Sequence, residues 1–442
     1  MVFNEGEVNV NSVATALRKM QRELDQEFTD EPGFRALSVS LSLSERSDPL
    51  GWLTRQAIYP QFYWQHRDGK EEVAALGQVK TFPTLKDARI FCQQYATLPS
   101  VRLWGLNAFD LTQGYLFLPR FEWRRQGGEA VLWLYLYSET SLKDDVRQVL
   151  TLIEQLMPET SIPPLNLQLS SETHHPALPE WCDLINKAIT TIEQAVLDKV
   201  VLARATDLVF SSAVSAAGFM AASRRLNLNC YHFLMVFNAR QAFLGSSPER
   251  LWQRLDRRLD TEALAGTVTN HEDDGRARAL ADWLLKDDKN QRENMLVLED
   301  ICQRLQNVVD ELDVLPPEVI RLRNVQHLKR GIYAMLKNTD DQICLEQLQP
   351  TAAVAGLPRE QAREFIARNE PFDREWYAGS AGYLSIHQSE FCVALRSAKI
   401  TDDTVRLYAG AGIVAGSVAL QEWQEIENKA AGLRTLLLKN RR

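Results

Sequence analysis

The chain has 442 residues, of which 45% are hydrophobic and 24% charged, as in ordinary globular proteins. Its net charge of −8 at pH 7 argues against a surface for nucleic acid or for an anionic membrane. The six cysteines are scattered without a C-x-x-C pair, which predicts reduced thiols and no disulfide framework or zinc site. Residues 1–20 lack an apolar signal segment and no apolar run is long enough to span a membrane, so we expect a cytoplasmic protein.

The N-terminal portion, residues 1–157, is predicted to be rich in β-strands. Leucines and valine alternate with serines over residues 37–43, which is the period of a strand. The aromatic run 62–64 leads into the turn 67–70, whose Asp-Gly pair is typical of a hairpin. A second hairpin is expected from GYLFLPRFEW through Gln126-Gly127-Gly128-Glu129 into AVLWLYLY, and helices over 11–27 and 142–157.

Residues 158–176 are rich in Pro, Ser and Thr and are predicted to be a linker. The portion that follows, residues 177–442, mixes helical and strand patterns. Helices are expected over 179–196, 215–225, 275–312 and 419–438, and strands over 199–210, 231–238, 242–247 and within 376–414. The fold class is therefore α+β: two large antiparallel β-sheets packed as a sandwich with helices outside, in one intertwined unit.

Lys199 begins an expected strand whose two faces are both mostly apolar. Such a strand is central, and Lys199 then points toward an interior. Two interpretations follow. A lysine at a strand end whose amine reaches water is favoured by this residue alone, whereas a desolvated lysine could act as a general base.

Glu249 follows an expected strand and Pro248, and it precedes Arg250. A glutamate at such a position is usually part of a surface ion pair. The alternative is a carboxylic acid that stays protonated until a leaving group needs its proton.

In the last helix, Glu422, Glu425 and Lys429 lie beside the apolar stripe. Two carboxylates at i and i+3 can reach one hard cation, although an ion pair between Glu425 and Lys429 is equally consistent with the spacing. Glu293 lies in another helical segment. If it lay near Glu425, the two would supply the sparse oxygen shell that Mg²⁺ accepts.

The segment YAGAGIV, 408–414, does not match G-x-G-x-x-G, which excludes a dinucleotide site. Gly410 and Gly412 would still let backbone N–H groups approach an anion closely. Arg396, on an expected strand, and Tyr377 are candidate anion ligands. His327 is most simply interpreted as an ordinary helix histidine.

These motifs, in this order, resemble those of the chorismate-utilising enzymes, which include isochorismate, salicylate, anthranilate and aminodeoxychorismate synthases. Two further motifs, YPQFYWQ and WGLNAFD, extend the likeness over the whole chain to the isochorismate synthases of menaquinone biosynthesis. Between about 190 and 435 it rests on KVVLAR, GSSPERL, TEALAGT, RENMLVLED, PTAAVAGLPR, WYAGSAGYL, ALRSAKI, YAGAGIV and EWQEIENKAAG.

The resemblance implies an Mg²⁺-dependent isomerase, a monomer or homodimer, that converts chorismate to isochorismate reversibly. Lys199 would activate water for attack at ring C2, and Glu249 would protonate the departing C4 hydroxyl. Glu293 and Glu425 would bind Mg²⁺, with Glu422 assisting through water. The implied substrate-binding residues are Thr267, His327, Tyr377, Arg396, Gly410, Gly412 and Lys429.

Four positions refine this expectation. Relatives that use ammonia typically have glutamine where this chain has Lys199. Ala265 stands where aminodeoxychorismate synthases have a nucleophilic lysine, so covalent catalysis is not expected. Asn294 and Gln349 replace histidines of many relatives, which leaves the supporting contacts open. Salicylate synthase and a catalytically silent chorismate-binding protein remain alternatives.

Overall fold

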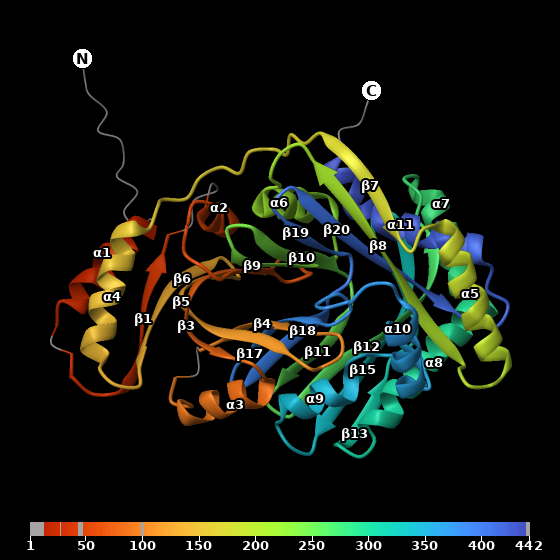
Figure 1. Cartoon of the computed structure of the whole chain (residues 1–442). Helices are drawn as coiled ribbons and strands as arrows, with labels where there is room; N and C mark the ends of the chain where they lie inside the picture. Colours follow the sequence, from red (N-terminus) through yellow and green to blue (C-terminus); the bar gives the residue numbers. More distant parts are fainter. Residues whose placement is uncertain (1–12, 27, 43–46, 99–100, 439–442) are drawn as a thin grey trace.

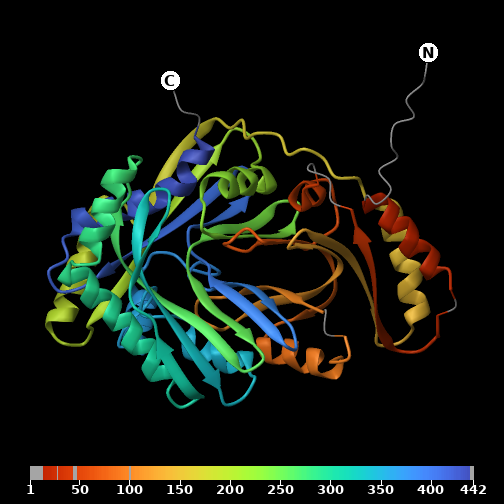
Figure 2. The same ribbon diagram turned by 180° about the vertical axis from the view of Figure 1, so that it is seen from behind.

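The structure, a computed structural model, describes residues 13–26, 28–42, 47–98 and 101–438. Its strands form one hydrogen-bonded network that bends into two facing layers, with helices on the outside (Figures 1 and 2). Neighbouring strands run antiparallel at every described pairing. The predicted α+β class is therefore confirmed.

The first layer contains, in spatial order, β1 (Gly33–Leu41), β6 (Glu129–Ser138), β5 (Gly114–Gln126), β3 (Glu71–Phe82), β2 (Gln61–Gln65), β9 (Tyr231–Asn238), β10 (Gln241–Ser247), β19 (Ser397–Thr401), β20 (Thr404–Ile413), β8 (Lys199–Phe210) and β7 (Leu169–His175). The short β16 (Gly356–Leu357) also pairs with β8. The second layer continues from β5 through β4 (Leu103–Asn107), β17 (Ser380–Leu384), β18 (Gln388–Val393), β11 (Arg250–Leu255), β12 (Arg258–Thr269) and β15 (Val325–Leu336), with β13 (Val309–Val314) and β14 (Glu318–Arg321) along the outer edge of β15.

The two layers share β5, so they are one continuous network where we expected two separate sheets. One edge of β5 pairs with β3. Along the other edge, residues 114–117 pair with β4 and residues 121–126 with β6. Pro119 lies between these two stretches, and a proline cannot donate the hydrogen bond that would continue either pairing.

The helices cover the outside of both layers. Helices α1 (Val13–Leu24) and α4 (Leu142–Gln155) pack against β6, while α2 (Pro49–Thr54) and α6 (Ala216–Leu226) cover the first layer. Below the second layer lie α3 (Leu85–Gln94) and α9 (Asp341–Leu348) (Figure 1). Helices α5 (Leu178–Glu193), α7 (Asp274–Leu284), α8 (Asp288–Leu305), α10 (Arg359–Asn369) and α11 (Ala419–Leu437) gather at the end formed by β8 and β12 (Figures 1 and 2). Within the described residues, every helix is too short or too polar to cross a bilayer.

The apolar core has two main parts, on either side of the first layer. Trp64, Trp104 and Trp252 belong to the part between the layers, and all three are fully buried. Trp52 and Phe219 belong to the part beneath the outer helices. Strand β8 contributes side chains to both parts: Val200 and Leu202 to the first, Leu208 and Phe210 to the second.

Two predicted elements differ from the structure, and three strands that follow α8 were not predicted. The helical region expected over 275–312 is two helices followed by β13, and β13–β15 were not predicted at all. The side chains of β13 are mostly exposed and show little apolar alternation, so the period-2 signal is weak there. The expected linker includes β7, which pairs with β8. Leu43 and the ends of the helix expected over 11–27 lie outside the described residues.

Candidate active site

A cavity lies between the layers, beside α8 and α11. Residues far apart in the sequence meet there because β12, β15 and β20 run past it and both helices cover it. The predicted site residues on its wall are Glu249, Thr267, Glu293, His327, Tyr377, Arg396, Gly410, Gly412, Glu425 and Lys429. Lys199 reaches the wall through its contact with Glu293.

Lys199 is buried, with 1% of its surface exposed, so its amine does not reach open water. Nζ donates a hydrogen bond to Oε1 of Glu293 at 3.1 Å and forms an ion pair with it. Burial raises the pKa of Glu293, but the charge and hydrogen bond of Lys199 outweigh burial and lower it. Glu293 is therefore a carboxylate at neutral pH, and Lys199 stands beside it on the floor of the site.

Glu249 lies between β10 and β11 and is only 2% exposed. It forms no surface ion pair with Arg250, and its Oε1 has no hydrogen-bond partner among the described residues. Burial, helped by the negative charge of Glu262, raises the pKa of Glu249 to about 8, against the charges of Lys199 and Lys429. The side chain is thus a neutral carboxylic acid at pH 7, which can donate a proton into the cavity.

Arg396 and His327 form a hydrogen-bonded pair on the cavity wall. Arg396 Nη2 donates to His327 Nε2 at 2.8 Å. Burial and the charge of Arg396 lower the pKa of His327 well below its ordinary value, so the ring is neutral. Because a guanidinium only donates, Nε2 must accept, and Nδ1 then carries the proton that it shares with Thr267 Oγ1 at 3.0 Å. His327, itself bonded to Thr267, thus holds the Arg396 guanidinium in place on the cavity wall.

Two expectations for these residues were wrong. His327 lies on β15, not on a helix, where it pairs with Thr267 of β12. Arg396 lies between β18 and β19 instead of on a strand, and its φ of 46° falls in the left-handed region. Such a backbone conformation is strained for an arginine and often accompanies a functional site.

Lys429 and Glu425, one turn apart on α11, form the ion pair that their spacing allows, at 2.7 Å. Lys429 Nζ also donates to the carbonyl oxygen of Gly410 at 2.9 Å. Glu422 is buried but does not line the cavity. Burial and the charge of Glu425 raise the pKa of Glu422. The helix therefore brings one carboxylate, Glu425, and one ammonium, Lys429, to the cavity wall.

The carboxylates of this site suit a hard cation. Among the described residues, no three His, Cys, Asp or Glu side chains form a ready-made metal site. Glu293 and Glu425 instead face one cavity, each paired with a lysine. Two carboxylates with room for water and ligand oxygens suit a divalent cation such as Mg²⁺, which keeps much of its own water. The donor set therefore fits the expected metal.

Gly410 and Gly412 let β20 pass close to the reactive side chains. A Cβ on Gly410 would lie 2.9 Å from the Tyr377 hydroxyl. A Cβ on Gly412 would lie 3.0 Å from Cε of Lys199 and 3.3 Å from Oε1 of Glu293. Any larger residue at either position would displace these groups.

Asn294 supports strand β12 where it forms the cavity wall, a role that the sequence did not reveal. Its fully buried amide donates to the carbonyl oxygens of Ala263, Ala265 and Leu328 at 3.0–3.2 Å. The register of β12 against β15 shifts there, between Leu264 and Thr267. Gln349 lies further off, where its amide donates to Ala108 O at 2.6 Å. Asn294 and Gln349 therefore contact backbone carbonyl groups and do not line the cavity.

The sequence did not single out several of the wall residues. Ala353 and Val354 lie within the motif PTAAVAGLPR, and Tyr408 begins YAGAGIV. Their membership of these two motifs was the only sign in the sequence that they belong to the site. Pro248 and Leu395 flank the expected Glu249 and Arg396. Ala265 also lines the cavity and offers no nucleophile.

Comparison with known proteins finds relatives over nearly the full length of the chain. The chain is 60% identical over 428 residues to isochorismate synthase MenF of Escherichia coli (strain K12), which covers 97% of this chain and 99% of that protein. It is 41% identical over 396 residues to isochorismate synthase MenF of Haemophilus influenzae, which covers 89% and 90%. The solved structure of the menaquinone-specific isochorismate synthase MenF of Escherichia coli superposes with a TM-score of 0.95 at 60% identity, over 96% of this chain and 100% of that one.

The family match covers the part of the chain that builds the cavity. The sequence model described as "Chorismate binding enzyme" matches residues 106–438, which include every predicted site residue. This match, together with the relatives over nearly the full length, makes the chain a member of the chorismate binding enzyme family.

Proposed function

We propose that this protein is an isochorismate synthase, an isomerase that interconverts chorismate and isochorismate on the path to menaquinone. The observation that carries the proposal is the neutral carboxylic acid of Glu249, buried with an unpartnered oxygen in the cavity that also holds Arg396 and Lys429. The 60% identity to isochorismate synthase MenF over 97% of the chain supports the same reaction.

The substrate is a dianion, and the cavity offers positive groups for both of its carboxylates. Arg396 and Lys429, with Tyr377 and the backbone near Gly410, would hold the enolpyruvyl carboxylate. Mg²⁺, held by Glu293 and Glu425 with Glu422 acting through water, would supply positive charge for the ring carboxylate. Positive charge fixed in advance in a largely dry cavity stabilises charge that develops during reaction.

The reaction exchanges one water for another, so its atoms balance. Lys199 takes a proton from a water molecule as its oxygen attacks ring C2. The ring double bond shifts, the C4–O bond breaks, and Glu249 gives its proton to the departing hydroxyl to make water. In the reverse direction the two residues exchange roles, because the same transition state is crossed.

A general base must offer a lone pair, so Lys199 would act as the neutral amine. Its Nζ lies 3.1 Å from Oε1 of Glu293. Location in the cytoplasm, and a monomer or homodimer, stay predictions from the sequence.

Product analysis tests the proposal. Purified protein is incubated with chorismate and Mg²⁺, and separately with isochorismate, and the products are separated by chromatography. We expect the same mixture of the two compounds from either direction. Salicylate formed without an added lyase would favour a salicylate synthase. The absence of any product would favour a catalytically silent chorismate-binding protein.

A further inference from the structure

The hairpin between β2 and β3 reaches from the N-terminal part of the chain to the backbone beside Glu249. At its tip, Arg67 Nη1 donates to the carbonyl oxygen of Pro248 at 3.1 Å. The same guanidinium binds Glu262 of β12 through two hydrogen bonds of 2.7 and 2.9 Å. Neither Arg67 nor Glu262 lines the cavity. The Arg67–Glu262 pair is therefore not placed to contact a substrate in the cavity.

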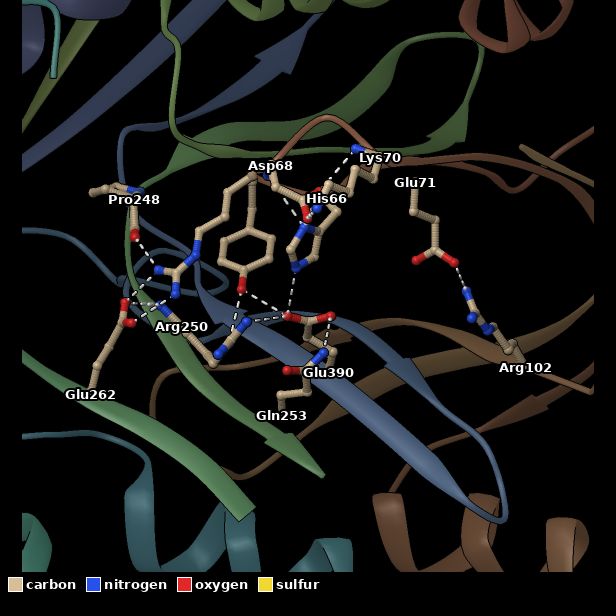
Figure 3. A network of polar contacts seen from close by, with 12 residues as sticks. His66, Asp68, Lys70, Glu71, Arg102, Pro248, Arg250, Gln253, Glu262 and Glu390 are labelled. Atoms are coloured by element: carbon tan, nitrogen blue, oxygen red, sulfur yellow. Dashed lines mark hydrogen bonds and ion pairs between the residues drawn. The ribbon is translucent and has the colours of Figure 1, made fainter. Parts of the chain in front are cut away.

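Glu262 also binds the backbone on the other side of Glu249. Its Oε1 accepts a hydrogen bond from the backbone N–H of Arg250 at 2.8 Å. Figure 3 shows Pro248, Arg250 and Glu262 together in this arrangement. The residues before and after Glu249 are thus both held by the Arg67–Glu262 pair, while one oxygen of the Glu249 side chain is left unpartnered.

A second set of contacts anchors the pair. Arg67 lies over the ring of Tyr231, 5.2 Å from its centre. The Tyr231 hydroxyl donates to Glu390 Oε1 at 2.7 Å and accepts from Arg250 Nε at 3.0 Å. His66, next to Arg67, contacts the same Glu390 oxygen at 3.2 Å (Figure 3). These side chains are buried or largely buried, so the hairpin tip is fixed against β9, β11 and β18.

Glu262 also acts through its charge. It is the nearby charge that contributes most to the raised pKa of Glu249, after burial. The charged groups that face Glu249 are Glu262 from β12, Lys199 from β8 and Lys429 from α11, and Glu293, His327, Arg396 and Glu425 share its cavity. Glu262 itself faces Arg67, Arg250 and, at 4.0 Å, Lys329.

We propose that Arg67 and Glu262 are positioning residues for Glu249: they fix the backbone on both sides of it and place a negative charge behind its carboxyl. The proposal rests on the function proposed above, in which Glu249 is the acid. It gives the hairpin of the N-terminal part a role in the chemistry of a cavity that it does not line.

The substitution Glu262→Gln separates charge from shape. A glutamine oxygen can still accept from Arg67 and from the Arg250 backbone, but the negative charge is gone. We expect the alkaline limb of kcat/KM to shift to lower pH. The matched control is Glu71→Gln, which removes the charge from another buried Glu–Arg pair, 2.7 Å from Arg102 and apart from this network (Figure 3). That control should have the same alkaline limb of kcat/KM as the wild type. If the alkaline limb of Glu262→Gln also lay at the wild-type pH, the proposal would be overturned.

Substitutions of Arg67 test whether the pair positions the backbone beside Glu249. Arg67→Met frees the Pro248 carbonyl, and we expect kcat to fall roughly 10- to 100-fold with KM little changed, because a small misplacement of a reacting group is costly. Arg67→Lys should recover part of this loss, since one ammonium can reach one of the two partners. An unchanged kcat in Arg67→Met would contradict the proposal, even if Glu262→Gln failed to fold.

A titration without substrate separates this proposal from the proposed function. Carboxyl groups of ¹³C-labelled glutamates are followed by NMR against pH, and the Glu249 signal is assigned by its loss in Glu249→Gln. We expect a lower midpoint in Glu262→Gln than in wild type or Glu71→Gln. Equal midpoints would refute the proposal. If wild type made no isochorismate, the function would fail while this measurement still decided the role of Glu262.

Discussion

Glu249 and Glu293 line the same cavity but carry different charge at neutral pH, because their neighbours differ. Burial and Glu262 raise the pKa of Glu249 to about 8. Burial also acts on Glu293, but contact with Lys199 lowers its pKa overall. Because their surroundings move the two pKa values apart, Glu249 is suited to donate a proton and Glu293 to act as an anion.

The raised pKa of Glu249 predicts the alkaline side of the pH profile. Glu249 would act as the acid only while protonated, so its contribution is full well below pH 8 and is lost as pH rises through about 8. The measurement is kcat/KM for chorismate from well below to well above pH 8. Glu249→Gln is the control. Its rate should fall about 10²–10⁴-fold and should no longer decline through pH 8. Calorimetry should still detect chorismate binding. A wild-type rate that stayed constant through pH 8 and above would contradict the assignment.

At the scale of elements, strong periodicity made β8 and α11 predictable, and the structure confirms both within one or two residues of the expected bounds. The strands from β13 to β15 were missed because β13 and β14 are edge strands with few buried side chains. His327 lies on β15, which is largely buried and paired on both edges, but it was still assigned to a helix. The strand character of that segment depends on pairing with β12, which is distant in sequence.

The site residues were predicted from motifs, but their contacts could not be. The pairing of Lys199 with Glu293 joins residues from β8 and α8, and no local pattern determines which carboxylate a lysine will meet. Arg67 was recognised only as part of a turn. Its role depends on where the hairpin tip ends in the folded molecule, 195 residues away in sequence from Glu262.

Helix α11 supplies the next prediction, on the metal. Glu425→Gln removes one of the two carboxylates that face the cavity, so we expect weaker Mg²⁺ binding by calorimetry and a higher Mg²⁺ concentration for half-maximal activity. Glu427→Gln on the same helix is the matched control, because Glu427 pairs with Arg204 and does not line the cavity. Equal Mg²⁺ dependence in the two variants would show that Glu425 is not a ligand.

At the scale of the whole molecule, the N-terminal and C-terminal portions share both layers. Strand β2 pairs with β9, and β4 pairs with β17. A fragment of residues 177–442 would expose these two strand edges together with the apolar side chains beneath them, and exposed edges favour aggregation. We therefore expect the fragment to be unfolded or aggregated, as judged by circular dichroism and size-exclusion chromatography. A folded, monodisperse fragment that converts chorismate would contradict this view.

In the proposed reaction, water is added at C2 and the C4 hydroxyl leaves as a second water. Conversion of chorismate in water enriched in ¹⁸O tests this directly, with the product examined by mass spectrometry at early times. We predict isochorismate labelled at the C2 oxygen. Isochorismate without label would mean that the hydroxyl moves within the substrate, and would contradict the roles of Lys199 and Glu249.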